Sequence, residues 1–404
     1  MKVLHTADWH LGQRLMNRHR QGEQQLALDW LLETIRREEI DVLVVAGDIF
    51  DTPNPPNYAE QLYFDFLKKL IQTDCRHVIL IGGNHDAPSK LNAPRELLKV
   101  FNIHVLGAIT GDLNDQIVEL NNQNGVLEGV VVLVPFLRDR DLIYAEAGEG
   151  SVEQSSRLKK AIAGHFEALA DLTTKYPADI PIIATGHLFA TDAVTSGKQD
   201  NIYVGNIENI DAGQFPNNFD YVALGHIHRA QSVGGKVHVR YSGSLIPVSF
   251  SEINDVKSVT IIEFTKGNFM EHQKLPIPTF RYLMQMKGTY DEIIIQINQR
   301  LKGRNYDLKP WVEIEIDQKE IHSLLDSELR QYVADAGGEV LRIKVNRAES
   351  SLVLQQAGSV SLQDIDDLAV FEQRCRQWGL SEKELLEVKE DYLALKDWMQ
   401  HQFD

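Results

Sequence analysis

The sequence is poor in cysteine and has no long apolar run. Its 404 residues include two cysteines, Cys75 and Cys375, which are too few and too far apart for a disulfide framework or a thiolate zinc site. No apolar run approaches the ~20 residues of a membrane-spanning helix, and Asp8 interrupts the start of the chain before a signal-peptide core could form. We therefore expect a cytoplasmic protein with no membrane association.

Positive charge is also scarce. The chain has 41 Lys and Arg against 58 Asp and Glu, which gives a formal net charge of −17. Because a polyanion is bound by local positive charge that displaces its counterions, this balance excludes a surface broadly adapted to nucleic acid. Contact with DNA would then need a local patch, bound metal ions or a partner. The sequence also lacks a Gly-x-x-x-x-Gly-Lys-Ser/Thr loop, so we expect no nucleotide bound by this chain itself.

Short apolar runs predict strands that are buried on both faces. Between the first three runs, Leu28, Leu31, Leu32 and Ile35 have the spacing of a buried helix stripe, and a similar stripe follows before the third run. The opening is thus β-α-β-α-β, and the later, more closely spaced strands predict the second layer of an α/β sandwich. The six runs lie at residues 2–6, 41–46, 77–81, 180–185, 220–224 and 238–241.

Two prolines, Pro276 and Pro278, predict a domain boundary. We expect one domain over 1–275, a smaller α/β domain over 276–346 and a helical segment over 347–404. In the second domain, apolar residues of the strand 311–316 alternate with Glu313 and Glu315, which predicts a sheet with one solvent-facing side. In the last segment, an apolar stripe over 385–403 predicts either a docking helix for a partner or a helix packed on its own domain.

Polar side chains follow five of the predicted strands. Carboxylate, imidazole and carboxamide ligands without thiolate favour Mn²⁺, Fe²⁺ or Zn²⁺ over Ca²⁺. In several of these places a glycine directly precedes the polar residue, which lets the backbone turn sharply. The candidate ligands are Asp8, His10, Asp48, Asn84, His187, His226 and His228.

Seven ligands suit two metal ions better than one. We expect Asp48 to be the shared ligand, because its two carboxylate oxygens can face two ions. Two such ions ~3.5–4 Å apart activate water and clamp the oxygens of a phosphoryl group, which predicts phosphoester hydrolysis. His85, beside a ligand, is placed either to donate a proton to the leaving oxygen or to stabilise the charge of the transition state.

Three arginines, Arg14, Arg18 and Arg20, occur in a stretch without acidic residues over 11–22, just after the first ligand pair. Arginine suits phosphate contact because its guanidinium is a fork of donors. The stretch is either a DNA-binding loop or an ordinary solvated loop.

These motifs resemble those of the calcineurin-like metallophosphoesterases, and Trp9–Gly12 with 241–250 resemble the SbcD nuclease branch in particular. The resemblance implies a four-layer sandwich of two mixed sheets flanked by helices, with a smaller α/β capping domain and C-terminal helices. The motifs are His5-Thr6-Ala7-Asp8-Trp9-His10-Leu11-Gly12, Gly47-Asp48-Ile49-Phe50-Asp51, Gly83-Asn84-His85-Asp86, Gly186-His187, Gly225-His226-Ile227-His228 and Tyr241-Ser242-Gly243-Ser244.

The resemblance also implies a ligand assignment. One ion, usually Mn²⁺, would be bound by Asp8, His10, Asp48 and His228. The other would be bound by Asp48, Asn84, His187 and His226, with His85 as the catalytic histidine. Some relatives have a histidine where this chain has Asp51, so an assisting role at that position is open.

For function, the resemblance implies the nuclease subunit of a bacterial complex. Its partner would be an SbcC-like ATPase of the SMC family, in an assembly with two copies of each subunit that acts at DNA ends and hairpins. The implied activity is ATP-dependent double-strand exonuclease and single-strand endonuclease in DNA repair, recombination and replication, near the nucleoid. The alternatives are a small-molecule metallophosphatase or cyclic-nucleotide phosphodiesterase, disfavoured by the extra domain, and a scaffold without catalysis, which would lack ligands.

Overall fold

The computed structural model describes residues 1–142, 151–190, 193, 209–265, 268–317 and 325–346, and seven single residues from 371 to 392. The chain forms two compact units, one of Met1–Ile316 with His322–Lys344 and another of Asp317–Ile321 with Val345–Asp404. Most of the second unit lies outside the described residues, including nearly all of the segment predicted over 347–404. In the part that is described, no helix is long and apolar enough to cross a bilayer.

The first sheet has six strands in the order β16-β15-β1-β4-β5-β6. The four strands from β1 to β6 run parallel, and β15 and β16 are added antiparallel at one edge. The predicted strands at 2–6, 41–46 and 77–81 are thereby confirmed to within one residue. The bounds are β1 (Lys2–Thr6), β4 (Val42–Ala46), β5 (His77–Ile81), β6 (Ile103–Leu106), β15 (Ser258–Thr265) and β16 (Asn268–Pro276).

The second sheet also has six strands, in the order β13-β14-β12-β9-β8-β7. Its four central strands are parallel, and the two outer strands pair antiparallel with their neighbours. The bounds are β7 (Ile117–Asn121), β8 (Leu127–Val132), β9 (Ile182–His187), β12 (Tyr221–Gly225), β13 (Gln231–Val233) and β14 (Lys236–Tyr241).

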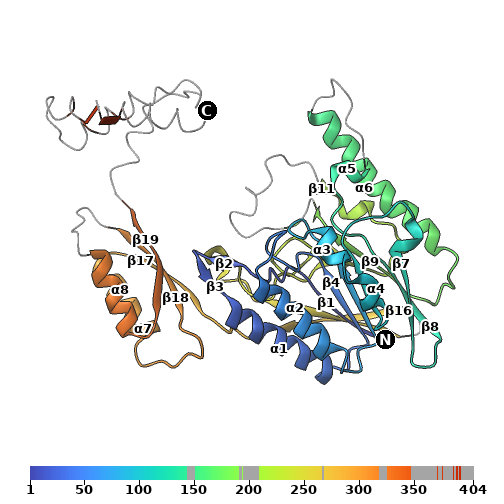
Figure 1. Cartoon of the computed structure of the whole chain (residues 1–404), viewed down its shortest axis with the longest axis horizontal. Coiled ribbons are helices and arrows are strands. Elements are labelled where there is room, and N and C mark those ends of the chain that lie inside the picture. The colour runs from blue at the N-terminus through green and yellow to red at the C-terminus, as the bar shows by residue number, and fades with distance from the viewer. Residues whose placement is uncertain are drawn as a thin grey trace. The chain divides into compact units, whose positions relative to one another are not determined.

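The two sheets pack face to face and helices cover their outer faces (Figure 1). Between the sheets, Val44 and Ile79 of the first share a buried core with Val131 and Ile183 of the second. Helices α1 (Gln21–Arg37) and α2 (Asn57–Leu70) pack on the first sheet, and α6 (Ser151–Thr173) packs on the second. The apolar stripe of α1 is buried as its periodicity predicts. The predicted four-layer α/β sandwich is confirmed.

Short elements connect these layers. They are the hairpin β2 (Arg14–Leu15) and β3 (Arg18–His19), the pair β10 (Phe189–Ala190) and β11 (Asn209–Ile210), the helices α3 (Pro88–Asn92), α4 (Arg95–Lys99) and α5 (Asp139–Leu142), and the 3₁₀ turns η1 (Leu113–Gln116), η3 (Ala212–Gln214) and η4 (Phe250–Glu252).

The residues after the two prolines form a three-stranded sheet, β17-β18-β19, and two helices. We call this sheet together with its helices the capping sheet. Its core is joined to earlier elements, because Leu15 of β2 and Phe250 of η4 are buried with Leu283 and Trp311. The bounds are β17 (Leu283–Gly288), α7 (Tyr290–Arg300), β18 (Trp311–Asp317), α8 (Leu325–Asp335) and β19 (Glu339–Asn346).

The solvent-facing side predicted for the capping sheet holds for Lys287 and Glu315, whose side chains are 57% and 22% exposed, but one residue on that side differs. Glu313 does not face solvent, since its side chain is 1% exposed. Arg342 and Lys344 of the neighbouring strand pair with this carboxylate, and Gln285 donates a hydrogen bond to it at 2.8 Å. The alternating pattern identifies a polar face but not the cations that cover the acid.

Candidate metal centre

The candidate ligands lie at the carboxyl ends of parallel strands in both sheets. Strands β1, β4 and β5 are neighbours in the first sheet and β9 and β12 in the second, so polar residues that follow them meet at one edge of the sandwich. Hydrogen bonds fasten the loops together: the Asp8 N–H donates to Gly47 O at 3.0 Å and the His10 N–H to Asp48 O at 3.0 Å. The His226 N–H donates to Asp8 Oδ1 at 2.9 Å and so links the two sheets.

The backbone at this edge is strained. Four residues there have positive φ angles, a region that residues other than glycine rarely adopt. They are Asp8 (51°), His10 (45°), Asp48 (49°) and His226 (102°). Such strain persists only where surrounding structure enforces it, and it concentrates at functional sites. Four of the seven candidate ligands show it.

Close backbone approach at two glycines makes this arrangement possible. A Cβ at Gly225 would overlap the carbonyl oxygen of Ala46, and one at Gly83 would overlap the side chain of Asp48. The glycines that precede His226 and Asn84 in the sequence are therefore needed to let the loops meet.

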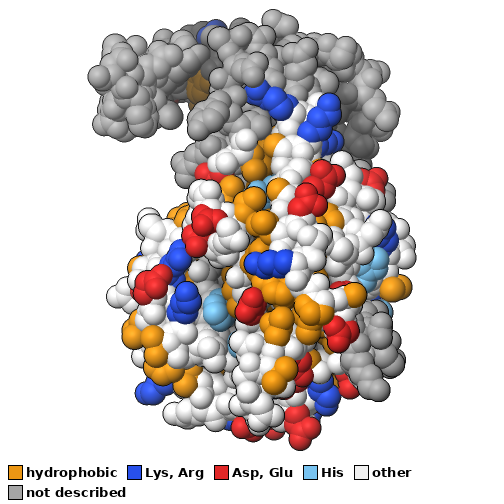
Figure 2. Space-filling view, turned by 90° about the vertical axis from the view of Figure 1, so that its right-hand side faces the viewer, with side chains coloured by type: hydrophobic (Ala, Val, Ile, Leu, Met, Phe, Trp, Pro, Cys, Tyr) orange, Lys and Arg blue, Asp and Glu red, His pale blue; other side chains and the backbone are white. Residues whose placement is uncertain are grey.

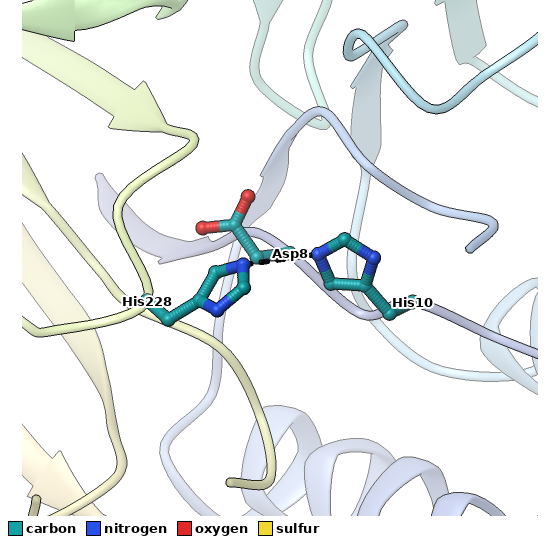
Figure 3. Close-up of side chains that lie close together, drawn as sticks. All are labelled: Asp8, His10 and His228. Carbon is teal, nitrogen blue, oxygen red and sulfur yellow. Dashed lines mark hydrogen bonds between the residues drawn. The ribbon is translucent and has the colours of Figure 1, made fainter. Parts of the chain in front are cut away.

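Asp8, His10 and His228 form one group of side chains, which we call group 1 (Figure 3). One ligand atom from each lies within 4.8 Å of the others. The Nε2 atoms of His10 and His228 are 3.1 Å apart, and Asp8 Oδ2 is buried without a hydrogen-bond partner among the described residues. An orphaned carboxylate oxygen beside two converging imidazole nitrogens is a donor set that fits a divalent cation.

Asp48, His187 and His226 form a second group within the same 4.8 Å limit, which we call group 2. Asn84 belongs to it by position, because its Oδ1 lies 3.0 Å from His187 Nε2 and 3.1 Å from His226 Nδ1. The His187 Nδ1–H donates to Ala46 O at 2.8 Å, which leaves Nε2 as the nitrogen that faces the group.

Asp48 lies between the two groups. Its Oδ2 is 3.3 Å from His187 Nε2 in group 2 and 3.7 Å from His10 Nε2 in group 1. This position suits a carboxylate that is shared by two ions.

His85 lies beside both groups and is half-buried. It forms a third close group with His10 and Asp51. Its Nδ1 is 2.7 Å from the Asp51 carbonyl oxygen, and its backbone N–H donates to Asp48 Oδ1 at 2.9 Å. The Asp51 carboxylate instead lies 3.2 Å from His10 Nδ1. At this position the chain therefore offers His10 a carboxylate and His85 a carbonyl.

The buried charges at this edge shift one another's pKa values. Burial raises the pKa of Asp8 and lowers that of His226 to about 3, so the His226 ring is uncharged at neutral pH. Burial also opposes protonation of His10 and His187, but nearby carboxylates outweigh it. Asp51 and Asp48 raise the pKa of His10 to about 9, and Asp48 raises the pKa of His187 to about 9. The carboxylates thus attract positive charge to this edge, the property that a cation site requires.

Two supporting acids were not identified from the sequence. The buried Asp86 carboxylate accepts hydrogen bonds from the backbone N–H groups of Ile49, Phe50 and Gly83, and so joins the loop of Asp48 to that of Asn84. Glu252 Oε1 is 3.0 Å from His228 Nδ1. Asp86 ends the Gly-Asn-His-Asp motif and could have been found there, whereas Glu252 has no local signal.

The three predicted DNA-binding arginines differ in their surroundings. Arg20 is fully buried: its guanidinium donates to both carboxylate oxygens of Glu23, at 3.0 and 2.6 Å, and also to Gln13 and the Pro247 carbonyl. The prediction that Arg20 contacts DNA is wrong, because its donors already have partners inside the protein. Arg18 is 57% exposed with Glu339 at 2.8 Å, and Arg14 is exposed in β2.

Comparison with known proteins places the chain in a family. The calcineurin-like phosphoesterase family matches residues 1–230, and the family described as Type 5 capsule protein repressor C-terminal domain matches residues 279–378. The D subunit of the nuclease SbcCD from Escherichia coli (strain K12) is 36% identical over 388 residues, which cover 95% of each chain. The same subunit from Bacillus subtilis (strain 168) is 32% identical over 338 residues, 80% of this chain and 82% of its own. The chain therefore belongs to the calcineurin-like phosphoesterases, and among them to the D subunits of SbcCD nucleases.

Proposed function

We propose that this chain is the nuclease subunit of an SbcCD-type complex and hydrolyses DNA phosphodiester bonds at a centre of two metal ions. The observation that carries the proposal is the position of Asp48 between two groups of metal-type ligands. The relatives named as nuclease subunits, one of which matches 95% of the chain, support a nucleic acid as the substrate.

In this proposal Asp8, His10, Asp48 and His228 hold one ion, and Asp48, Asn84, His187 and His226 hold the other. Mn²⁺ is the metal that the family resemblance implies, and carboxylate, carboxamide and imidazole ligands without thiolate admit it together with Fe²⁺ and Zn²⁺. When bound, such ions supply Lewis acidity toward phosphoryl oxygens and lower the pKa of water.

His85 supplies the proton chemistry of the chain itself. Its Nδ1–H donates to the Asp51 carbonyl, which orients the ring and leaves Nε2 for the substrate. In its protonated form Nε2–H donates to the leaving oxygen of the scissile phosphate. The buried carboxylate of Asp86 keeps His85 in place indirectly, because it fixes the loop from Gly83 to Ile49 and Phe50.

DNA contact in this proposal is local. Figure 2 shows Lys and Arg interspersed with Asp and Glu on the face in view, in keeping with the net charge of −17. Arg14 and Arg18 remain the proposed phosphate contacts, since the β2–β3 hairpin follows directly on His10 and both side chains have exposed surface. The proposed domain division is a nuclease domain over 1–275, a DNA-recognition cap over 276–346 and a partner-binding segment over 347–404.

The proposed partner is an SbcC-like SMC-family ATPase, which provides the nucleotide site for ATP-dependent exonuclease and hairpin endonuclease activity. We place its docking helix at 385–403. A second copy of this chain completes a two-plus-two assembly.

The test compares a labelled DNA hairpin with p-nitrophenyl phosphate, using the purified chain with Mn²⁺, alone and with its ATPase partner and ATP. We expect hairpin cleavage, enhanced by the partner, that is lost when His85 is replaced. Hydrolysis of the small ester alone would reject the nuclease proposal in favour of a small-molecule phosphatase or cyclic-nucleotide phosphodiesterase. The capping sheet already argues against that alternative, because a small ester needs no second domain.

A further inference from the structure

The segment after β14 contacts two different parts of the molecule within three residues. Phe250, at the start of η4, is buried with Leu283 and Trp311 of the capping sheet. Glu252, at the end of η4, is 1% exposed and lies 3.0 Å from the ring of the candidate ligand His228. One short turn therefore connects the capping sheet with group 1.

Glu252 uses both of its oxygens to hold this region. Oε1 faces His228 Nδ1, and Oε2 accepts hydrogen bonds from Lys257 Nζ at 2.6 Å and from the Val248 N–H at 3.1 Å. Lys257 Nζ also donates to the carbonyl oxygen of His228 at 2.9 Å. A single buried ion pair thus fixes His228 at its ring and at its backbone.

The carboxylate determines which nitrogen of His228 faces the group. As an acceptor, Oε1 favours a proton on Nδ1, so the lone pair is on Nε2, which lies 3.1 Å from His10 Nε2. A carboxylate behind an imidazole fixes the tautomer and increases the basicity of a metal-binding nitrogen. His187 in group 2 is oriented instead by the carbonyl of Ala46, a residue of strand β4 inside the sheet.

A second route joins the capping sheet to group 1. The Arg281 guanidinium stacks on Trp311 at 4.2 Å, and its Nε is 3.6 Å from the Glu23 carboxylate that holds Arg20. Arg20 in turn donates to Gln13 Oε1 at 2.7 Å. The Gln13 side chain donates to Val248 O at 2.7 Å, and its backbone N–H donates to the carbonyl of the ligand His10 at 3.0 Å.

We propose that Glu252 is a positioning residue for His228 and that, through Phe250, ion binding at group 1 depends on the packing of the capping sheet. This inference rests on the proposed function, because it takes His228 as a metal ligand. Its consequence is an asymmetric centre: group 2 is held by the sheets of the sandwich, whereas group 1 responds to the capping sheet.

Mn²⁺ titration of the full chain by calorimetry, followed by electron paramagnetic resonance, tests the positioning role. The wild-type chain should bind two ions and give the signal of a coupled Mn²⁺ pair. Glu252→Ala should reduce the affinity for one ion by ~10- to 100-fold and leave the affinity for the other unchanged. At Mn²⁺ concentrations that fill only one site, the signal of the coupled pair should then be lost. Glu252→Gln should weaken it less, because the amide oxygen still accepts from His228 Nδ1–H. Glu263→Gln, which removes an exposed Glu of β15, should match the wild type.

Glu252→Ala also leaves Lys257 buried without its carboxylate, which could reduce affinity through poor folding. The double variant Glu252→Gln with Lys257→Met leaves no buried charge unpaired, and because it also removes the Lys257 hydrogen bond to the His228 carbonyl, it tests the ion pair as a unit. We expect it to unfold at or near the wild-type temperature and still to bind the group 1 ion more weakly. Wild-type affinity for both ions in this double variant and in Glu252→Ala would overturn the proposal.

Phe250→Ala tests the link to the capping sheet, with Val256→Ala as the matched control because Val256 is 74% exposed in the next loop. We expect Phe250→Ala to weaken the same ion as Glu252→Ala by a few-fold, and Val256→Ala to change neither. Unchanged affinities in Phe250→Ala would overturn the link to the capping sheet. A wild-type chain that binds fewer than two ions would instead contradict the proposed function, so the two failures are distinct.

Discussion

The two ends of the first sheet differ in how their polar groups are paired. At the amino ends of its parallel strands, charges are paired: Arg76 lies 2.9 Å from Asp41 and 2.7 Å from Glu128, and the Lys2 N–H donates to Asp41 at 2.8 Å. At the carboxyl ends, Asp8 Oδ2 is buried without a hydrogen-bond partner among the described residues, and three candidate ligands, Asp8, His10 and Asp48, have positive φ.

This difference separates stability from binding within one sheet. Paired, partly exposed charges contribute modestly to the stability of the fold, about 0–1 kcal/mol for each pair. Converging, strained and incompletely paired groups cost folding free energy, which a bound cation can return. The following substitutions at either end of the sheet test this difference.

Replacement of the shared carboxylate has the largest expected effect. Asp48→Asn should reduce binding of both ions and bring DNA cleavage below detection, because Asp48 is close to both groups. Metal content after dialysis against Mn²⁺, measured with cleavage of a labelled hairpin, checks this. Full occupancy of one site in the variant would mean that Asp48 serves a single ion.

Replacement of His85 should separate chemistry from metal binding. His85→Gln should lower the cleavage rate by ~10²- to 10⁴-fold, the usual contribution of a general acid, while two ions still bind. Single-turnover cleavage and Mn²⁺ titration on the same preparation measure both quantities. Loss of an ion would make His85 a ligand rather than a proton donor.

At the amino ends the expected effect is on stability alone. Arg76→Met should reduce the free energy of unfolding by about 1–2 kcal/mol, since it removes a partly exposed cation between Asp41 and Glu128. Urea unfolding gives this value, and Mn²⁺ affinity should equal that of the wild type. A change in metal affinity would show that the two ends are not independent.

A pH effect near the same end is the smallest expected. Burial, together with His77 and Lys99, lowers the pKa of His104 in β6 from 6.5 to about 4. Because the pKa of His104 is lower in the folded state than in the unfolded state, the neutral ring contributes to the free energy of unfolding. This contribution is complete above pH 6.5 and is lost as pH falls toward 4.

Comparison of urea unfolding at pH 7.5 and pH 5 tests this linkage in metal-free protein. His104→Asn should lose about 1 kcal/mol less than the wild type over this interval, a value reduced for the partial exposure of the ring. Equal losses in the wild type and His104→Asn would show that His104 does not contribute.

Local patterns predict the strands and the residues that follow them. Buried parallel strands give continuous apolar runs, and the carboxyl ends of such strands meet at one edge, so Asp8, Asp48 and Asn84 can be grouped from the sequence alone. The ligand assignment itself stays a prediction, as does the domain division. The predicted docking helix at 385–403 lies largely outside the described residues.

Contacts between residues far apart in the chain could not be predicted in this way. Arg20 looks like a phosphate contact in its acid-free stretch, but Glu23 one turn later and the Pro247 carbonyl take its donors. Glu252 is an ordinary loop acid until folding brings it to His228, and Glu313 is an exposed strand residue until Arg342 covers it. Hydrophobic periodicity predicts the face of a helix or strand on which a residue lies, but it does not predict which distant residue contacts it there.

The hydrogen bond from the His226 N–H to Asp8 Oδ1 joins residues 218 positions apart, and group 1 likewise needs both Asp8 and His228. During synthesis on the ribosome, the first 186 residues carry Asp8, His10, Asp48 and Asn84 but none of the three later histidines, and His226 and His228 follow only in the second half of the chain. A truncated product that ends before Gly225 therefore cannot assemble the proposed centre. The order of these residues along the chain thus makes the proposed centre depend on both sheets of the sandwich.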